Sequence, residues 1–436
     1  MLAPEDTVVP VLGPCTIPSP LRLGRQPEAG FPPFVPETAR VRYRVDCDPT
    51  CGTEPDIFFE KAGPRERLFF DPRRTRAAIV TCGGLCPGLN NVIRSIFLEL
   101  HYNYGVPEVL GLRYGYAGLN PAVAEPPLRL TPELVDTIHE EGGTILGTSR
   151  GPQPVEVMVE FLVERGIDLL FCVGGDGTLR GARSIAEEVL RRGLKIAVVG
   201  VPKTIDNDVM YVQRTFGMQT AVDKAREVLD AAHNEAKSAY NGVGLVKVMG
   251  RDAGFIAAMA TLASQEINFT LIPEVPLVLD GPRGFLETLR RRLMARHHAV
   301  VVVAEGVGRE LMAGEPTETD ASGNPKPPDI GPFLRHRIIQ HMRRNGTPVD
   351  VKYFDPSYLI RSVPANSDDA IFCDALARHA VHAGMAGKTN VVVGIWNSVF
   401  TLVPIPLAVS GKKQVDPAGP LWKSVLAATG QPPVWS

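Results

Sequence analysis

Short apolar runs rich in β-branched residues, each ending at a turn of glycine or proline, most constrain what this chain can fold into. Between them lie helical stretches at residues 92–100 and 179–192. Strands that are apolar throughout and alternate with helices indicate a parallel sheet covered by helices on both faces. The expected strands are residues 77–81, 167–173, 195–201, 243–249, 300–304 and 391–395.

Length and charge limit the class of protein. The 436 residues suggest two or three folding units, at roughly 150 residues per domain. Lysine and arginine number 46 and aspartate and glutamate 48, a net charge of −2, which does not favour nucleic acid or an anionic membrane as a partner. No apolar run approaches the roughly 18 residues of a membrane-spanning helix. Seven cysteines are too few for a disulfide scaffold, so we expect a cytoplasmic protein.

The first 75 residues differ from the rest, because they hold 13 of the 39 prolines. Proline lacks a backbone donor and is rare inside sheets, so this segment is not an ordinary α/β layer. The pairs Phe58-Phe59 and Phe69-Phe70 favour an irregular strap packed over the body, and a partly mobile tail is the alternative. We expect the body to begin near Arg76 and residues 313–332 to form a surface loop.

The turn at residues 174–178 (GGDGT) carries the first functional signal. Open parallel sheets bind ligands at the carboxyl ends of their strands, and glycines there let backbone N–H groups approach phosphate oxygens. Asp176 is placed to hold a magnesium ion that would balance the phosphate charge. A tight strand-to-helix turn capped by Thr178 is the alternative interpretation.

The turn at residues 202–208 (PKTIDND) follows another expected strand. Asp206 and Asp208 could divide the work of deprotonating a hydroxyl nucleophile and supporting it or the metal, while Lys203 neutralises phosphate charge. The alternative is an Asx-rich turn without chemistry. Two such turns on neighbouring parallel strands would face one crevice, which favours phosphoryl transfer.

These turns belong to a wider set of motifs. The others are TCGGLCPGLN at 81–90, GTILGTSR at 143–150, MGRDAG at 249–254, AEG at 304–306 and KYFDPSYLIR at 352–361. In order and spacing the set resembles the 6-phosphofructokinase family over residues 58–410. Residues 58–72 resemble the plant-like and protist branch of that family, which is close to the pyrophosphate-using enzymes.

The resemblance implies an α/β fold of two Rossmann-like lobes with mainly parallel sheets, plus an irregular N-terminal extension. It also implies a glycolytic phosphotransferase that uses ATP and Mg²⁺ to phosphorylate the 1-hydroxyl of fructose 6-phosphate. The parts would be the extension at 1–75, the phosphoryl-donor lobe at 76–217 plus about 362–410, the fructose 6-phosphate lobe at 218–361, and a C-terminal tail at 411–436.

Roles for individual residues follow from the same resemblance. Asp206 would be the general base, with Asp208 beside it, while Arg150 and Arg251 would stabilise the transferring charge. Tyr116 would lie near the nucleotide base. The donor site would comprise Gly84, Tyr116, Arg150, Gly175, Asp176 as the magnesium ligand, Gly177, Thr178 and Gly181. The sugar-phosphate site would comprise Thr204, Ile205, Asp206, Met249, Gly250, Arg251, Glu305, Lys352, Tyr358 and Arg361.

A few positions depart from the family pattern or bear on specificity. Gly177 leaves room for a nucleotide where pyrophosphate-using relatives carry aspartate, whereas Lys203 is typical of those relatives, and the mixture favours ATP. Lys352 stands where bacterial members have an arginine that reaches into a neighbouring subunit, so a homodimer or homotetramer is expected. Gly242 replaces another arginine of the bacterial pattern, and Tyr358 replaces a histidine, as is usual in the plant-like branch.

Other interpretations stand beside this one. The chain could be a pyrophosphate-dependent enzyme, or a non-catalytic subunit that senses sugar phosphates. A lipid or nucleotide kinase is disfavoured, because it would not need the segment at 352–361. A zinc site formed by Cys47, Cys51, Cys82 and Cys86 is disfavoured too, because the last two cysteines fall in the phosphate loop.

Overall fold

The chain forms two compact units in a computed structural model that describes residues 2–23, 33–46, 56–313 and 329–436. Unit 1 comprises Met1–Thr204, Val209–Gly217 and Val363–Gly411, and unit 2 comprises Ile205–Asp208, Met218–Ser362 and Lys412–Ser436. The N-terminal extension therefore groups with unit 1. The C-terminal residues, expected as a separate tail, group with unit 2.

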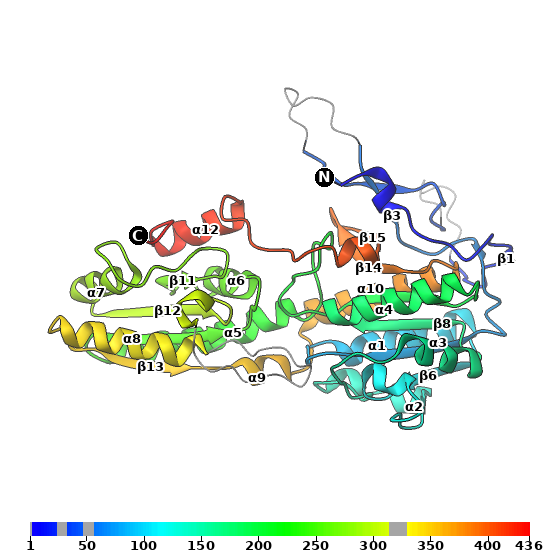
Figure 1. The fold of residues 1–436 in the computed structure, drawn as a ribbon, viewed down its shortest axis with the longest axis horizontal. Coiled ribbons are helices and arrows are strands. Elements are labelled where there is room, and N and C mark those ends of the chain that lie inside the picture. The colour runs from blue at the N-terminus through cyan, green and yellow to red at the C-terminus, as the bar shows by residue number, and fades with distance from the viewer. Residues whose placement is uncertain (1, 24–32, 47–55, 314–328) are drawn as a thin grey trace. The chain divides into compact units, whose positions relative to one another are not determined.

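Unit 1 is built on a nine-stranded sheet of order β2-β3-β15-β14-β9-β8-β5-β6-β7 (Figure 1). Its central strands β14, β9, β8, β5 and β6 run parallel, and the strands added at both edges run antiparallel. The strands are β2 Arg40–Arg42, β3 Phe58–Lys61, β5 Arg76–Thr81, β6 Glu108–Leu112, β7 Leu128–Arg129, β8 Leu169–Gly174, β9 Ala197–Pro202, β14 Val391–Trp396 and β15 Val399–Pro404.

Helices cover both faces of this sheet, because its central strands are apolar on both sides. A Cβ placed on Gly384 of α10 would contact Leu169 and Phe171 of β8, whereas one placed on Gly200 of β9 would contact Leu179 of α4. Gly200 pairs with Cys172 of β8, so it faces the side of the sheet opposite to Leu169 and Phe171. Helices α10 and α4 therefore cover opposite faces of the sheet. The helices of the unit are α1 Leu89–Leu98, α2 Pro132–Val135, α3 Val155–Glu164, α4 Asp176–Arg191, α10 Ser367–Met385 and α11 Ile405–Ala408. The 3-10 helices are η1 Pro4–Thr7, η4 Gly115–Leu119 and η5 Ile138–Glu140, and the π-helix η3 Glu99–Tyr104 follows directly after α1.

Part of the proline-rich extension has regular structure, which differs from the irregular strap that the sequence suggested. Phe59 is fully buried in β3, and β3 pairs with β15 and β2 at the edge of the main sheet. A second small sheet pairs β1 Ile17–Pro18 with β4 Arg67–Leu68. Nearer the N-terminus, the amide of Leu12 donates to the Gly387 carbonyl at 2.9 Å, so the extension is also bonded to the body of unit 1. The strands escape detection because each is only two to four residues long.

Unit 2 contains a fully parallel sheet of order β11-β12-β10-β13. Helix α5 lies close to β10, because a Cβ on Gly244 would stand only 2.6 Å from the Ala232 carbonyl oxygen. The strands are β10 Gly242–Val248, β11 Phe269–Leu271, β12 His298–Ala304 and β13 Asp350–Phe354. The helices are α5 Met218–Ser238, α6 Phe255–Ser264, α7 Phe285–Arg296, α8 Ile330–Arg344, α9 Ser357–Arg361 and α12 Pro420–Thr429, with the turn η6 Arg309–Met312.

The C-terminal segment is an integral part of unit 2. Trp422 and Val425 of α12 and the later Trp435 are buried in the core of the unit. Gln431 closes the free edge of β11: its side chain accepts from the Thr270 amide at 2.6 Å and donates to the Thr270 carbonyl at 3.1 Å. Among the described helices, none has the length and apolar character that a membrane span requires. Most of the surface loop expected at residues 313–332, from 314 to 328, lies outside the described residues.

Candidate active site

Three functional turns of unit 1 follow the adjacent parallel strands β9, β8 and β5 and are bonded to one another at the carboxyl ends of those strands. The backbone amide of Lys203, after β9, donates to the Gly174 carbonyl after β8 at 2.9 Å. Its Nζ donates to the Gly84 carbonyl, after β5, at 2.8 Å. Lys203 is 6% exposed, so it is a buried cation that links the glycine loops at the edge where a phosphate ligand is expected.

The GGDGT motif forms the start of α4, three residues earlier than the sequence suggested. Gly175 is the N-cap and Asp176 the first helical residue, so amides of this turn and the helix dipole favour an anion. A Cβ at Gly177 would have no atom within 4 Å, which leaves that space to a ligand. Asp176 pairs with Arg180 one turn along the helix, at 3.0 Å, which restrains its carboxylate at the helix start.

Tyr116 supports this turn from inside unit 1. Its hydroxyl donates to the Thr178 carbonyl at 2.6 Å, and the side chain is 7% exposed. The ring also fills the space beside Gly181, where a Cβ would approach it to 2.5 Å. Burial raises the pKa of Tyr116 well above its ordinary value, so the phenol stays a hydrogen-bond donor. The expected neighbourhood of Tyr116 to a nucleotide base stays a prediction.

The loop that ends at Arg150 is bonded to the first glycine loop. The Thr148 hydroxyl donates to the Gly83 carbonyl at 2.5 Å, and the Gly83 amide donates to the Ser149 carbonyl at 3.2 Å. Arg150 itself is exposed. These bonds bring Arg150 to the same side of the sheet as the glycine turns, which is what a charge-stabilising role requires.

The DND turn of residues 206–208 belongs to unit 2. The backbone amide of Arg251 donates to Asp206 Oδ2 at 3.3 Å, so the turn after β10 is bonded to the turn that carries the expected base. Burial, and then the negative charges of Asp208 and Glu305, raise the pKa of Asp206 from 3.8 to about 7. A carboxylate with this pKa is a far stronger base than an exposed aspartate.

Two lysines that the sequence did not suggest contact the same turn. Lys412 Nζ lies 2.6 Å from Asp208 Oδ2, and Lys413 Nζ donates to Asn207 Oδ1 at 2.9 Å. They come from the start of the C-terminal segment, 204 and 206 residues from their partners. No family motif includes them, and only the folded chain shows that they belong here.

The sugar-phosphate motifs of unit 2 converge at the ends of β10 and β12. The Glu305 amide donates to the Val248 carbonyl at 2.9 Å, and the Gly306 amide donates to the Gly250 carbonyl at 3.1 Å. Burial raises the pKa of Glu305, while the positive charge of Arg251 opposes that shift. Met249, Gly250, Arg251 and Glu305 are therefore brought together, as the motifs predict.

A buried lysine fixes the segment that precedes α9. Lys247 Nζ lies 2.8 Å from Asp355 Oδ2 and 2.9 Å from Asp329 Oδ2, and these contacts hold its pKa above the ordinary value despite burial. Asp355 also accepts from the Ser357 hydroxyl at 2.6 Å, at the first residue of α9. Further along α9, the Arg361 guanidinium lies 4.4 Å from the centre of the Tyr358 ring. Two side chains expected at the sugar-phosphate site thus form a cation–π pair.

Lys352 is not brought to this group within its own unit. It lies inside β13 opposite Gly244 of β10, five residues before Met249. At about 3.3 Å per residue, this register separates it from the Met249 turn by roughly 16 Å along the strand. Its Nζ lies 3.1 Å from Asp350 on the same strand.

No cluster of three or more His, Cys, Asp or Glu side chains that could hold a metal occurs in the described parts of the chain. Magnesium, however, is usually held by one or two carboxylates together with substrate phosphates, and Asp176 at the start of α4 fits that mode. Of the cysteines considered for zinc, Cys82 and Cys86 are buried free thiols, and Cys47 and Cys51 lie outside the described residues.

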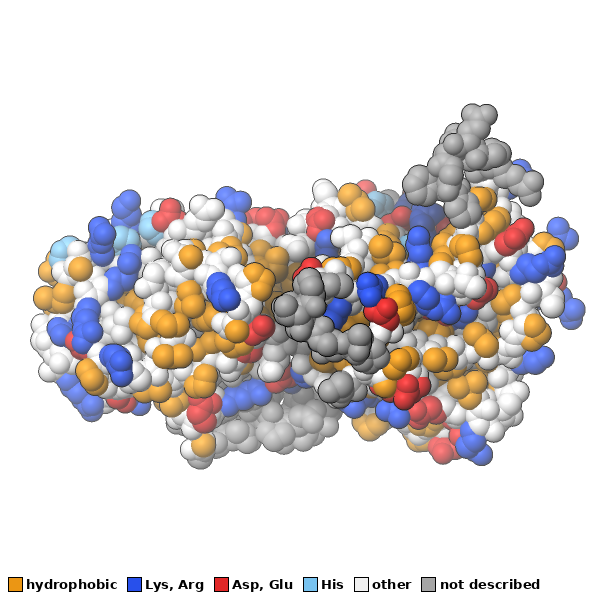
Figure 2. Space-filling view, turned by 90° about the horizontal axis from the view of Figure 1, so that it is seen from above, with side chains coloured by type: hydrophobic (Ala, Val, Ile, Leu, Met, Phe, Trp, Pro, Cys, Tyr) orange, Lys and Arg blue, Asp and Glu red, His pale blue; other side chains and the backbone are white. Residues whose placement is uncertain are grey.

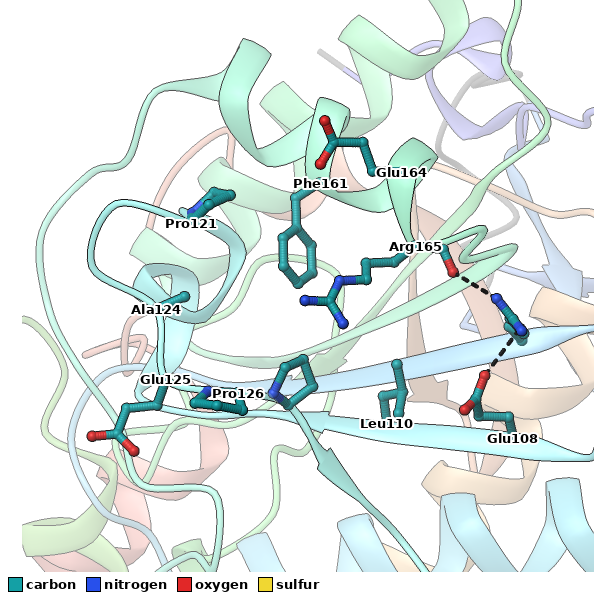
Figure 3. Close-up of a pocket in the computed structure, with 11 residues that line it drawn as sticks. Glu108, Leu110, Pro121, Ala124, Glu125, Pro126, Phe161, Glu164 and Arg165 are labelled. Carbon is teal, nitrogen blue, oxygen red and sulfur yellow. Dashed lines mark hydrogen bonds and ion pairs between the residues drawn. The ribbon is translucent and has the colours of Figure 1, made fainter.

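A cavity of about 480 Å³ in unit 1 lies elsewhere (Figure 3). Its lining includes Arg76 and Glu108, the first residues of β5 and β6, and Phe161 and Arg165 of the α3 end. It therefore opens at the amino ends of the strands, away from the glycine turns. On the face drawn in Figure 2, acidic and basic side chains are interspersed, in keeping with a net charge of −2.

Glycine turns at the carboxyl ends of parallel strands, as in unit 1, are typical of α/β proteins that bind phosphate groups. The comparisons with known proteins identify the class as a phosphotransferase. The family described as Phosphofructokinase matches residues 76–384. An ATP-dependent 6-phosphofructokinase of Borreliella burgdorferi is 46% identical over 435 residues, which cover 98% of this chain and 97% of that protein. The chain belongs to the phosphofructokinase family.

Two further proteins are similar to this chain. A protein named ATP-dependent 6-phosphofructokinase from Entamoeba histolytica is 48% identical over 373 residues, 84% of each chain. The solved structure of a pyrophosphate-dependent phosphofructokinase from Marinobacter aquaeolei has the same fold, with a TM-score of 0.66 and 20% identity, over 83% of this chain and 92% of that one.

Proposed function

We propose that the chain is an ATP-dependent 6-phosphofructokinase, which transfers the γ-phosphoryl group of ATP to the 1-hydroxyl of fructose 6-phosphate. The products are ADP and fructose 1,6-bisphosphate. The observation that carries the proposal is the DND turn, where Asp206 has a pKa of about 7 and is bonded to the Met249–Arg251 sugar-phosphate turn. The relatives named ATP-dependent 6-phosphofructokinase support it.

Asp206 acts as the general base. A base works best when its pKa lies near the working pH, because it is then both ionised and able to take a proton. The Arg251 amide holds one of its oxygens at 3.3 Å, which orients the other toward a substrate hydroxyl. The proton of the 1-hydroxyl passes to this carboxylate as the oxygen attacks the γ-phosphorus.

Residues of unit 2 bind the sugar phosphate. Glu305 accepts from sugar hydroxyls, and burial raises the pKa of its carboxyl group. The stacked Arg361 and Tyr358 bind the 6-phosphate, for which the planar guanidinium offers two parallel donors. Met249, Gly250 and Arg251 line the substrate beside the base.

Residues of unit 1 bind the phosphoryl donor. The amides of Gly84, Gly175, Gly177 and Thr178 approach phosphate oxygens, and Arg150 offsets the charge that develops on transfer. Asp176 would hold Mg²⁺, which when bound neutralises phosphate charge and orients the donor.

ATP is the donor because of the open space at Gly177, which a nucleotide α-phosphate can use. Lys203, typical of pyrophosphate-using relatives, is engaged with the Gly84 carbonyl at 2.8 Å and so serves here to hold the glycine loop. The alternative donor, pyrophosphate, is an outcome of the test below.

An oligomer is the active form in this proposal. Lys352 lies too far along β13 to reach the sugar-phosphate turns of its own unit, so a neighbouring copy is its expected target. We also place the enzyme in the cytoplasm, a proposal supported by the free cysteines of the described residues, among them Cys82, Cys86 and Cys172.

The test offers purified protein fructose 6-phosphate and Mg²⁺ with ATP or with pyrophosphate, and measures fructose 1,6-bisphosphate. ATP should be the better donor, and Asp206→Asn should lower kcat by roughly 100-fold or more. Asp223→Asn, at an exposed position of α5, is the matched control and should keep full turnover. Faster turnover with pyrophosphate would reverse the donor assignment. If neither donor gave product, the chain would not be an enzyme of this kind, and the alternative of a non-catalytic subunit would be favoured.

A further inference from the structure

The first residues of the C-terminal segment are bonded to Asn207 and Asp208 of the catalytic turn. Lys412 Nζ pairs with Asp208 Oδ2 at 2.6 Å, and Lys413 Nζ donates to Asn207 Oδ1 at 2.9 Å. The backbone amide of Lys413 donates to the Asp208 carbonyl at 3.0 Å. Three bonds from two consecutive lysines therefore hold Asn207 and Asp208 in place.

The turn needs such partners. Asn207 has a φ of 56°, in the left-handed region that Asn tolerates when its side chain is bonded. The side chain of Asp208 is 10% exposed and that of Lys412 32% exposed, so the aspartate is the more deeply buried member of the pair. A buried carboxylate without a cation is strongly unfavourable, and the Lys412 ammonium 2.6 Å away supplies a cation to Asp208.

The charge of Asp208 matters to the base two residues before it. In unit 2 the charges that act on Asp206 include those of Asp208, Glu305 and Lys412, and the Arg251 amide donates to its carboxylate. Lys413, whose pKa burial lowers to about 7, interacts with Asp208 from the same segment. Asp208 and Glu305 raise the pKa of Asp206 and Lys412 lowers it. Lys412 thus opposes the repulsion from Asp208 and Glu305, which raises the pKa of Asp206.

We propose that Lys412 is a positioning residue, which neutralises Asp208 and so leaves Asp206 as the base of the turn, while Lys413 fixes Asn207. The inference rests on the proposed function of Asp206 and adds the C-terminal segment to the catalytic apparatus. Asp208 has a structural and electrostatic task here, because one of its oxygens is held by a lysine.

Anchors outside the two lysines hold the segment in place. Gln414 Nε2 donates to the Asp252 carbonyl at 3.0 Å, and the Val415 amide donates to Glu274 Oε1 at 2.8 Å. Val415 is 2% exposed, and Trp422 in the following helix is 1% exposed. A substitution at Lys412 should therefore leave the fold of unit 2 intact.

The experiment compares wild type, Lys412→Gln and Lys412→Arg by kcat/KM for fructose 6-phosphate between pH 5.5 and 9, at saturating ATP. Loss of the cation should lower kcat at neutral pH by roughly two- to fivefold, because a smaller fraction of Asp206 is then ionised. It should also move the acidic limb to higher pH by roughly half to one unit, with little change in KM. Lys412→Arg, which keeps the positive charge, should have the kcat and the acidic limb of the wild type. Lys423→Gln, at an exposed lysine of α12, is the control and should behave as wild type.

A thermal-unfolding cycle tests the pairing independently of activity. Lys412→Gln alone should lower the unfolding midpoint at pH 8, and adding Asp208→Asn should recover much of the loss, because no buried charge then lacks its partner. The inference would be overturned if the two substitutions lowered the unfolding midpoint additively, or if the acidic limb of the pH profile did not move in Lys412→Gln. Neither result would affect the proposed function, provided that the wild type is active. A wild type inactive with both donors would overturn the proposed function and the role of Lys412 in it.

Discussion

Replacing Asp206, the proposed general base, should make the protein more stable while it lowers turnover. The pKa of Asp206 is raised from 3.8 to about 7, so the folded protein binds its proton more tightly than the unfolded chain does. Between these two pH values the unfolded chain ionises first, and folding stability falls as pH rises. Above about pH 7 the full cost of the buried charge is present.

The size of this cost follows from the shift. A difference of about three pKa units corresponds to about 4 kcal/mol, at 1.36 kcal/mol per unit. The Asp206→Asn variant keeps the shape but not the charge, and weakening of the 3.3 Å bond from the Arg251 amide costs about 1 kcal/mol. We therefore expect a gain of about 3 kcal/mol above pH 7, which corresponds to a rise in Tm of roughly 3 °C for a chain of 436 residues.

The assay is thermal unfolding of wild type and Asp206→Asn from pH 5 to 8.5, with Asp223→Asn as the control for loss of one negative charge. The difference in Tm between variant and wild type should be small near pH 5 and should increase to its full value above pH 7. A difference that stays constant across this range would refute the raised pKa, and with it the argument that Asp206 is tuned to act as a base.

Three further predictions concern the two binding regions. The Gly177→Asp variant should fold normally, because a Cβ at this position meets no protein atom within 4 Å. It should lower kcat/KM for ATP by about 100-fold without lowering the use of pyrophosphate. Retained use of ATP would show that the nucleotide does not pass this residue. Tyr116→Phe should raise KM for ATP and lower stability by about 1–2 kcal/mol through the lost bond to the Thr178 carbonyl, with KM for fructose 6-phosphate unchanged; equal changes in both KM values would contradict this support role. Lys247→Met, by releasing Asp355 before α9, should raise KM for fructose 6-phosphate about tenfold with a smaller effect on kcat, whereas an unchanged KM would separate that ion pair from substrate binding.

Most of the central strands could be predicted because they are apolar on both faces, and each expected strand lies within two residues of its observed ends. The central strand β6 was not expected, because its sequence, EVLGL, is short and includes a glutamate and a glycine. Strand β13 was missed because its sequence, DVKYF, mixes polar and apolar residues at a sheet edge. The hairpin from β14 to β15 turns at Asn397 and Ser398, with φ of 49° and 62°. Asn-Ser is a weaker turn signal than Asn-Gly, so this antiparallel strand was not expected.

The candidate site likewise combines features that the sequence predicted with features that only the folded chain shows. Motifs placed the glycine turns, the DND turn and the sugar-phosphate turns correctly at strand ends, because the parallel sheet requires it. The lysines that partner the DND turn lie outside every motif, and a pairing across 204 residues has no local signature in the sequence. The inward-facing Tyr116 hydroxyl is likewise set by packing, since a Gly-Tyr-Ala-Gly-Leu string is equally compatible with an exposed ring.

Each unit is assembled from three separated stretches of chain, which has a consequence during protein synthesis. Strand β9 needs β14 as its neighbour, and the Val198 amide needs the hydroxyl of Thr389, 191 residues later. At about 5–20 residues per second, a ribosome leaves that side of β9 uncovered for roughly 10–40 s. Neither unit can therefore finish folding as the chain emerges, and a nascent apolar strand with one open edge is the species that chaperones would need to protect.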